Sequence, residues 1–331
     1  MKYKTLILAL TVLALGQVSP LLAQSDETKL DPVQARITTV SAMRMRTGPQ
    51  ITAAEVARLK LGTVVNAIAR SANQDTIGGK TDYWYRINLP NGVTGWVFGG
   101  LLLDYNVNQQ QQILRQIIEA RLQAENTDFS DRHEIYNLAA RSLSEAKDEN
   151  MRAEFELLKL LALRNSAAAF PNNLSDKSPY REWIKAHAAE VIENEFAGSY
   201  NMRADVLWNL ESKYHRLPIA DRIAWEASQT LPPSDCEGDE VCDFFLYEGE
   251  IKYLSLHPAG AHATEALKHL NEAVTDELIR EANEKGGDKY VVEQRAELRK
   301  LLASLRLAVS KISGSETTEI LKKLERITPT R

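Results

Sequence analysis

The two cysteines are close enough in sequence to form a disulfide. Cys236 and Cys242 have five residues between them, in the run Cys-Glu-Gly-Asp-Glu-Val-Cys. In an oxidising compartment such a pair is expected to be bonded, whereas in a reducing compartment it would remain as two free thiols. Because the closed loop is short, the bond should stabilise one local turn more than the whole fold.

The segment around the cysteines is poorly suited to nucleophilic catalysis. A reactive thiolate needs an electropositive setting, and this segment is acidic instead. Its carboxylates belong to Asp235, Glu237, Asp239, Glu240 and Asp243. We therefore predict no catalytic role for either cysteine.

The same acidic segment does not match a calcium loop. Asp235, Glu237 and Asp239 alternate as in an EF-hand, which also needs Gly at its sixth position and Glu at its twelfth. Glu240 and Leu246 occupy those two positions. A solvated acidic loop is the better interpretation.

Three histidines, His257, His262 and His269, lie close together in sequence. On a helix, His262 and His269 would share a face about 10 Å apart, which is too far for one zinc ion with ligands at about 2 Å. The chain also lacks His-Glu-x-x-His, Gly-x-Ser-x-Gly and phosphate-binding glycine motifs. We predict no metal, no cofactor and no enzymatic activity.

Aromatic and basic residues are the better candidates for ligand binding. In Tyr83-Trp84-Tyr85, alternation places the tryptophan on one face of a strand and both tyrosines on the other. The aromatic rings would stack on a peptide or sugar, and outward-pointing arginines would bind a carboxylate. Plain packing of the rings and a solvated strand face remain the alternatives. The predicted ligand-binding residues are Tyr83, Tyr85, Trp96, Arg44 and Arg46.

Residues 35–105 have the β pattern that must position these side chains. Met43-Arg44-Met45-Arg46 alternates apolar and charged residues, so both methionines should face inward and both arginines outward. Turn sequences such as Thr47-Gly48-Pro49 and Pro90-Asn91-Gly92 separate the expected strands. Several short strands in so few residues predict a small barrel.

Four blocks of this segment resemble the bacterial SH3-like (SH3b) domain family. In order they are Met-Arg-Met-Arg-Thr-Gly-Pro, Leu-Lys-Leu-Gly-Thr-Val-Val, Trp-Tyr-Arg-Ile and Gly-Val-Thr-Gly-Trp-Val. The resemblance covers about a fifth of the chain. It implies an SH3-like barrel that binds cell-wall peptides or protein segments. Residues 72–80 depart from the family as an insertion beside the usual ligand face, so the family's ligand does not carry over.

Residues 106–331 change to a helical pattern. Apolar residues recur every three or four positions, which predicts a stack of amphipathic helices. Segments 213–225 and 253–263 each end a helix on an aromatic residue, turn through Pro and start an alanine-rich helix. They resemble, loosely, tetratricopeptide-type helical repeats. An irregular helical bundle is the alternative.

The first 23 residues have the layout of a cleavable signal peptide. Lys2 and Lys4 precede an apolar run over 6–15, and Leu21-Leu22-Ala23 offers a cleavage site. The apolar run is shorter than the roughly 20 residues of a membrane span, although an uncleaved anchor is the alternative. We therefore expect a periplasmic or secreted protein with no integral membrane span after cleavage.

The sequence thus predicts a multidomain β + all-α protein. The expected order is signal peptide 1–23, linker 24–34, SH3-like barrel 35–105 and all-helical domain 106–331. The net charge of −5 and the lack of long single-sign runs argue against nucleic-acid binding.

Three functions follow from this organisation. The first is a non-enzymatic binding protein of the bacterial cell envelope, whose barrel binds peptidoglycan stem peptide or a segment of an envelope protein and whose helices bind a protein partner. The second is a protein-interaction scaffold whose barrel is only structural, with its aromatic face buried against the helices. The third is an envelope cell-wall hydrolase, which no motif supports.

Overall fold

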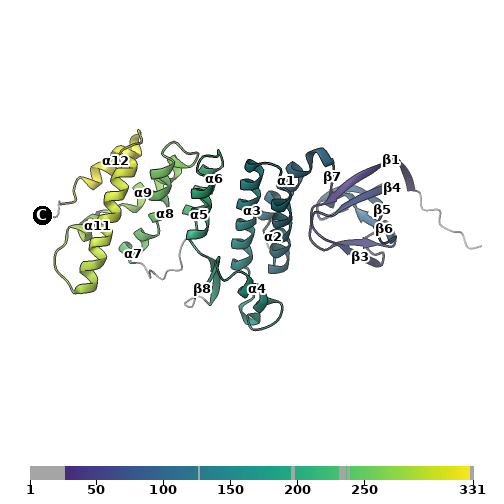
Figure 1. Ribbon diagram of the computed structural model, residues 1–331, viewed down its shortest axis with the longest axis horizontal. Helices are drawn as coiled ribbons and strands as arrows, with labels where there is room; N and C mark the ends of the chain where they lie inside the picture. The colour runs from purple at the N-terminus through teal and green to yellow at the C-terminus, as the bar shows by residue number, and fades with distance from the viewer. Residues whose placement is uncertain (1–26, 126, 195–197, 231–235, 237–238, 329–331) are drawn as a thin grey trace, which may run out of the picture.

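The computed structural model describes residues 27–125, 127–194, 198–230, 236 and 239–328. The predicted signal peptide lies outside these residues. The chain is elongated, with its strands at one end and its helices stacked toward the C-terminus (Figure 1). The architecture is an N-terminal antiparallel β region followed by a mostly helical region, as the sequence predicts.

Seven strands form one sheet in the order β3-β2-β6-β5-β4-β1-β7, and every pairing is antiparallel. They are β1 (Glu27–Thr38), β2 (Met43–Arg46), β3 (Glu55–Leu59), β4 (Val64–Ile77), β5 (Lys80–Asn88), β6 (Thr94–Phe98) and β7 (Leu102–Asp104). The side chains of Met43 and Met45 are buried in the barrel core, which confirms their predicted inward orientation. Val65, Ile87 and Val97 pack in the same core.

Two polar segments of the barrel are strands where the sequence indicates a linker and a loop. From Glu27 onward, the predicted linker 24–34 belongs to β1, and Glu27 pairs with Ser71 of β4. Residues 72–80 form the tip of the long β4–β5 hairpin, which turns at Gly78 and Gly79. Both segments are largely exposed, so backbone pairing holds them without the apolar alternation that identifies a buried strand.

The helical region contains α-helices, 3-10 helices and one small sheet. The α-helices are α1 (Gln110–Leu122), α2 (Phe129–Ser144), α3 (Glu149–Ala168), α4 (Tyr180–Ala186), α5 (Asp205–Tyr214), α6 (Ala220–Ser228), α7 (Glu240–Phe245), α8 (Glu248–Leu256), α9 (Ala263–Ala273), α10 (Asp276–Asn283), α11 (Lys289–Val309) and α12 (Ser315–Leu324). The 3-10 helices are η1 (Gly99–Leu101), η2 (Val107–Gln109) and η3 (Asn172–Leu174).

The small sheet corrects the prediction of an all-helical domain over 106–331. Strands β8 (Val191–Asn194) and β9 (Ser199–Met202) pair antiparallel beside α4. Tyr200 and Met202 alternate into the core, whereas Ile192 is 42% exposed. Four-residue strands are too short for a clear alternating pattern, which explains why the sequence alone does not reveal them.

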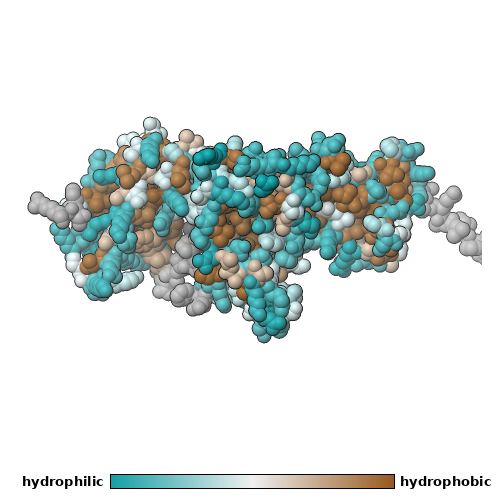
Figure 2. All heavy atoms as spheres, viewed as in Figure 1, coloured by the Kyte–Doolittle hydropathy of each residue, from teal (hydrophilic) through white to brown (hydrophobic). Residues whose placement is uncertain are grey.

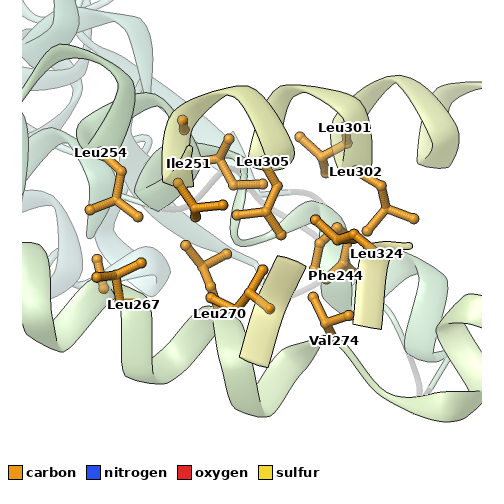
Figure 3. Close-up of a cluster of buried hydrophobic side chains, with 14 of the residues drawn as sticks. Phe244, Ile251, Leu254, Leu267, Leu270, Val274, Leu301, Leu302, Leu305 and Leu324 are labelled. Atoms are coloured by element: carbon orange, nitrogen blue, oxygen red, sulfur yellow. The ribbon is translucent and has the colours of Figure 1, made fainter. Parts of the chain in front are cut away.

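The helices pack as successive hairpins. Segments 213–225 and 253–263 each join two antiparallel neighbours, α5 to α6 and α8 to α9 (Figure 1). The Tyr253 hydroxyl donates to Asp221 Oδ1 at 2.8 Å and so links the two hairpins. Further along, α7 to α12 enclose a leucine-rich core whose side chains point toward one another (Figure 3).

The barrel and the first three helices share one hydrophobic core. Ile37 and Leu61 of the barrel are fully buried and pack with residues of α1, α2 and α3.

On the face shown in Figure 2, hydrophobic residues lie in patches between hydrophilic ones along the whole molecule. Within the described part of the chain, no helix is both long and apolar enough to cross a membrane.

Candidate functional site

A cleft of about 720 Å³ lies between the barrel and helix α2. The barrel wall is formed by the end of β3 and the turn after it, and the opposite wall is one face of α2. The lining residues are Ala42, Arg58, Leu59, Lys60, Ser130, His133, Glu134, Asn137, Ala140, Arg141 and Ser144. A concave site of this size can enclose a small ligand or a short segment of peptide.

The charges that line the cleft are mainly positive. Arg58, Lys60 and Arg141 are exposed, and Glu134 is the only acidic residue among the described residues of the lining. Among the described residues, the side chains of Lys60 and Asn137 have no hydrogen-bond or ion-pair partner. The cleft therefore offers a free ammonium and a free amide to an anionic, peptide-like ligand.

Arg58 is held in place by Glu55. Its Nε donates to Glu55 Oε1 at 2.7 Å, and Arg44 lies 3.5 Å from the same carboxylate. The hydrogen bond to Arg58 lowers the pKa of Glu55, and the carboxylate raises the pKa of Arg58. Two basic side chains of the barrel, Arg44 and Arg58, thus share one carboxylate beside the cleft, and Lys60 is left unpaired among the described residues.

The two walls are joined by specific contacts at the turn between β3 and β4. The backbone amide of Leu61 donates to Glu134 Oε1 at 2.8 Å. Gly62 has φ +73°, and a Cβ atom there would lie 2.5 Å from Leu138 Cδ1. Only glycine combines this backbone conformation with so close an approach to α2. These contacts hold the turn against α2, and Glu134 also lines the cleft.

His133 connects the cleft to an aromatic cluster. Its ring lies between Phe129 and Tyr136, with centroids 5.8 and 5.9 Å away. Tyr136 in turn packs edge-on against His187 of the segment after α4. Burial lowers the pKa of both histidines, so both are expected to be neutral at pH 7.

The aromatic residues predicted to bind ligand do not form an open groove. Tyr85 is buried in the barrel core beneath the guanidinium of Arg36. Tyr83 is half-buried and stacks with Arg70. Trp96 is buried on the other face of the sheet with Trp84 and Phe98. These rings therefore pack against other residues of the barrel. The scaffold hypothesis expected the helices to cover them instead.

The two predicted arginines differ in their environment. The side chain of Arg44 is 58% exposed and points outward, as predicted. Arg46 is only 9% exposed, because its guanidinium donates to the backbone carbonyl of Ala53 at 2.7 Å. Arg46 is therefore buried, which corrects the prediction that its side chain points into solvent. Ligand contact by all five predicted residues stays a prediction.

The long β4–β5 hairpin accounts for the burial of the outer tryptophans. Asp75 Oδ2 accepts a hydrogen bond of 2.6 Å from Trp84 Nε1, and Ile77 packs against the same ring cluster. The insertion over 72–80 therefore covers this face of the barrel with the chain's own residues.

The cysteines and histidines singled out in the sequence have structural partners. Cys236 and Cys242 form a disulfide, and Asp239 caps α7 by accepting from the amides of Val241 and Cys242. Each of the three clustered histidines lies beside a different glutamate. Across the part of the chain that the structure describes, no group of three or more acidic, histidine or cysteine side chains is placed to hold a metal ion.

Comparison with protein families matches residues 41–102 to the family described as Bacterial SH3 domain. The barrel is a bacterial SH3 domain. Its four sequence blocks and its antiparallel strands agree with this match. The comparisons give no support to tetratricopeptide-type repeats in the helical region. Searches of curated proteins and of solved structures found no match to the chain.

The residues that line the cleft carry little signal in the sequence. Arg58 and Lys60 flank the buried Leu59, and this alternation is typical of the solvated face of a strand. Arg141 lies about 80 residues further on, within an ordinary amphipathic helix. Only the shared core of the SH3 domain with α1 to α3 brings them together.

Proposed function

We propose that this chain is an exported, non-enzymatic binding protein of the bacterial cell envelope. Its SH3 domain would bind the carboxylate-rich stem peptide of peptidoglycan in the basic cleft against α2. The helical region would bind a protein partner. Bacterial SH3 domains often bind cell walls, and the observation that carries the proposal is the free cationic side chain of Lys60 beside Arg58 and Arg141.

The cleft has the groups that such a ligand requires. A peptide carboxylate would accept charge-assisted hydrogen bonds from Lys60 and Arg58, while the Asn137 amide can pair with a peptide backbone. The acidic side chain in the lining, Glu134, is occupied by the Leu61 amide. It therefore adds less repulsion toward an anion than a freely rotating carboxylate would.

Export is part of the proposal. The signal-like first 23 residues, the disulfide and the bacterial SH3 domain support it together. The non-enzymatic assignment is supported by the bonded state of Cys236, since a thiol in a disulfide is not a nucleophile. A reduced Cys236 beside a histidine would instead favour the hydrolase alternative.

Cosedimentation of the mature full-length chain with purified cell walls tests the proposal. We expect Arg58→Ala combined with Lys60→Ala to weaken retention by about tenfold, because two charge-assisted contacts are lost. The control removes two other exposed basic residues, Lys29 and Lys147, and should retain wild-type binding. Equal retention of the cleft variant and the control would refute the assignment of the site.

A second candidate, a scaffold whose SH3 domain is only structural, is favoured by the shared core. Ile37 and Leu61 are completely buried among residues of α1 to α3, so the domain covers the end of the helical stack. On this view the cell wall would not retain the protein at all. The same cosedimentation therefore separates the two candidates.

A further inference from the structure

A second cavity, of about 440 Å³, lies in the helical region far along the chain from the SH3 domain. Its lining comes from the end of α6, from α7 and the turn after it, and from α8 and α9. The lining residues are Ser228, Gln229, Asp243, Leu246, Tyr247, Glu250 and His269. Polar groups lie beside one aromatic and one aliphatic wall, the usual composition of a site for a small ligand.

Glu250 is the unusual residue of this cavity. Its side chain is 8% exposed, and its Oε1 faces His269 Nδ1 at 3.0 Å and Gln229 Nε2 at 3.4 Å. Its other oxygen, Oε2, is buried and has no hydrogen-bond donor among the described residues. A buried carboxylate oxygen without a donor is costly, so a native structure that keeps one calls for an explanation.

The surroundings of Glu250 are electronegative. Asp243 lines the same cavity from α7, and no Lys or Arg among the described residues belongs to the lining. Burial raises the pKa of Tyr247, and the nearby carboxylates of Glu250, Asp243 and Glu272 raise it further. The cavity therefore favours a positive charge.

The helices that carry these groups are held rigidly. Ile251 and Leu254 of α8 face Leu267 and Leu270 of α9 in the C-terminal core, and Phe244 of α7 points into the same core (Figure 3). Gly249 allows α8 to approach α6 closely, since a Cβ atom there would lie 2.8 Å from the Ser228 carbonyl oxygen. A site on packed helices keeps its polar groups in place before the ligand arrives.

We propose that this cavity binds an organic cation, the ammonium or guanidinium end of an alkyl chain, with Glu250 as its anchor and Asp243 as a second anion. The cation would supply the donor that Glu250 Oε2 lacks, after a small rotation about the soft terminal torsion of the carboxylate. Leu246 and Tyr247 would flank the alkyl chain, and the tyrosine ring can also face the cation.

A metal ion fits this cavity less well than an organic cation does. No cluster of three or more potential metal ligands exists among the described residues, and the cavity is far larger than a bare ion. The same cation chemistry could arrive as a free amine or as the lysine or arginine side chain of a peptide. The test must distinguish these two sources.

Titration of the full-length protein with n-butylammonium and with Nα-acetyl-lysine amide provides that test. Binding is followed by calorimetry and by NMR signals of the Gln229 side chain and Tyr247. We expect both probes to shift these signals, and tighter binding of the lysine derivative would assign the site to peptide side chains. Absence of any shift at millimolar concentrations of both probes would overturn the proposal.

Three variants locate the binding. Glu250→Gln should weaken it by at least about tenfold, because the charge-assisted contact is lost while the shape is kept. Asp243→Asn, on an exposed residue whose replacement should not affect folding, should weaken it several-fold. Glu248→Gln removes the same charge from the exposed side of α8 and should change binding less than about twofold.

Stability measurements separate a binding role from a structural one. If Glu250 serves a ligand, Glu250→Gln should unfold at the same temperature as the wild type or a higher one, since an incompletely paired buried charge is removed. Marked destabilisation by Glu250→Gln, together with unchanged probe binding in Asp243→Asn, would show that the residue only bridges α8 and α9.

Discussion

The backbone amide of Leu61 donates a hydrogen bond of 2.8 Å to the carboxylate of Glu134. This contact joins the SH3 domain to helix α2 across more than 70 residues of chain. Glu134 lines the basic cleft, and the side chain of Leu61 is fully buried. The geometry of the proposed binding site therefore depends on the docking of two elements that the sequence separates.

Replacement of Glu134 tests this docking. We expect Glu134→Ala to lower the free energy of unfolding by about 1–3 kcal/mol, because the Leu61 amide loses its acceptor. Glu134→Gln keeps an acceptor oxygen and should cost less. Chemical denaturation of the two variants measures the difference. Equal losses in both would mean that the hydrogen bond does not stabilise the junction.

Substitution of Gly62 tests the close approach of the β3–β4 turn to α2. A methyl group at this position would overlap Leu138, so we expect Gly62→Ala to destabilise the protein by about 1–3 kcal/mol. Gly78 also has a positive φ but has open space around it, so Gly78→Ala should cost only about 1 kcal/mol of backbone strain. Thermal unfolding should rank the two variants in this order, and the reverse order would contradict the packing described.

Acid should weaken the fold through the buried histidines. Burial lowers the pKa of His133 and His187 in the folded protein below the ordinary value of 6.5. The unfolded chain therefore binds more protons as the pH falls below about 6.5, and stability is lost there, by at most about 1.4 kcal/mol per pH unit for each histidine. Above that pH both histidines are mainly neutral in the folded and in the unfolded chain, so they cause no loss of stability.

Denaturation at pH about 7.5 and about 5.5 checks this dependence on the histidines. We expect His133→Gln to lose less stability between the two conditions than the wild type does. An identical loss in both proteins would assign the acid sensitivity to other groups.

Reduction of the disulfide should have a limited effect. The bond between Cys236 and Cys242 closes a loop with a sequence separation of 6, for which chain entropy predicts a contribution of about 2 kcal/mol. We expect Cys236→Ser combined with Cys242→Ser to fold and to lose about that much stability in urea denaturation. Failure of this variant to fold would show that the bond organises more than the turn before α7.

The sequence predicts the SH3 domain well because its signals are local. Met43 and Met45 are buried, as their alternation with arginines indicates, and the turn sequences lie where strands end. The cysteine spacing likewise predicts the disulfide. In each case the residues that carry the signal are neighbours in the sequence.

The candidate sites are harder to predict because they depend on distant contacts. Lys60 and Arg141 come from different elements, and burial of Arg46 depends on the loop that follows it. Tyr85 and Trp96 are equally aromatic, yet they are buried on opposite faces of the same sheet. In the sequence, nothing distinguishes Glu250 from the other acidic residues of a helix. Its burial follows only from the packing of α6 to α9.

The structure also decides which form of the protein a binding experiment needs. Residues 24–105 alone would expose Ile37 and Leu61, which are buried only because α1 to α3 cover them. Substitution of Tyr85 would disrupt the barrel core, so a loss of binding in that variant would not by itself report on ligand contact. Binding is therefore best measured on the full chain with variants of the exposed cleft residues.

The most direct test measures the affinity of the full chain for a soluble stem peptide with free carboxylates. It is compared with the affinity for the same peptide after amidation of its carboxylates. We expect the free peptide to bind, amidation to weaken binding at least about tenfold, and Arg58→Ala combined with Lys60→Ala to remove this preference. Equal affinity for both peptides, or a preference that survives the loss of both Arg58 and Lys60, would contradict carboxylate recognition in the cleft.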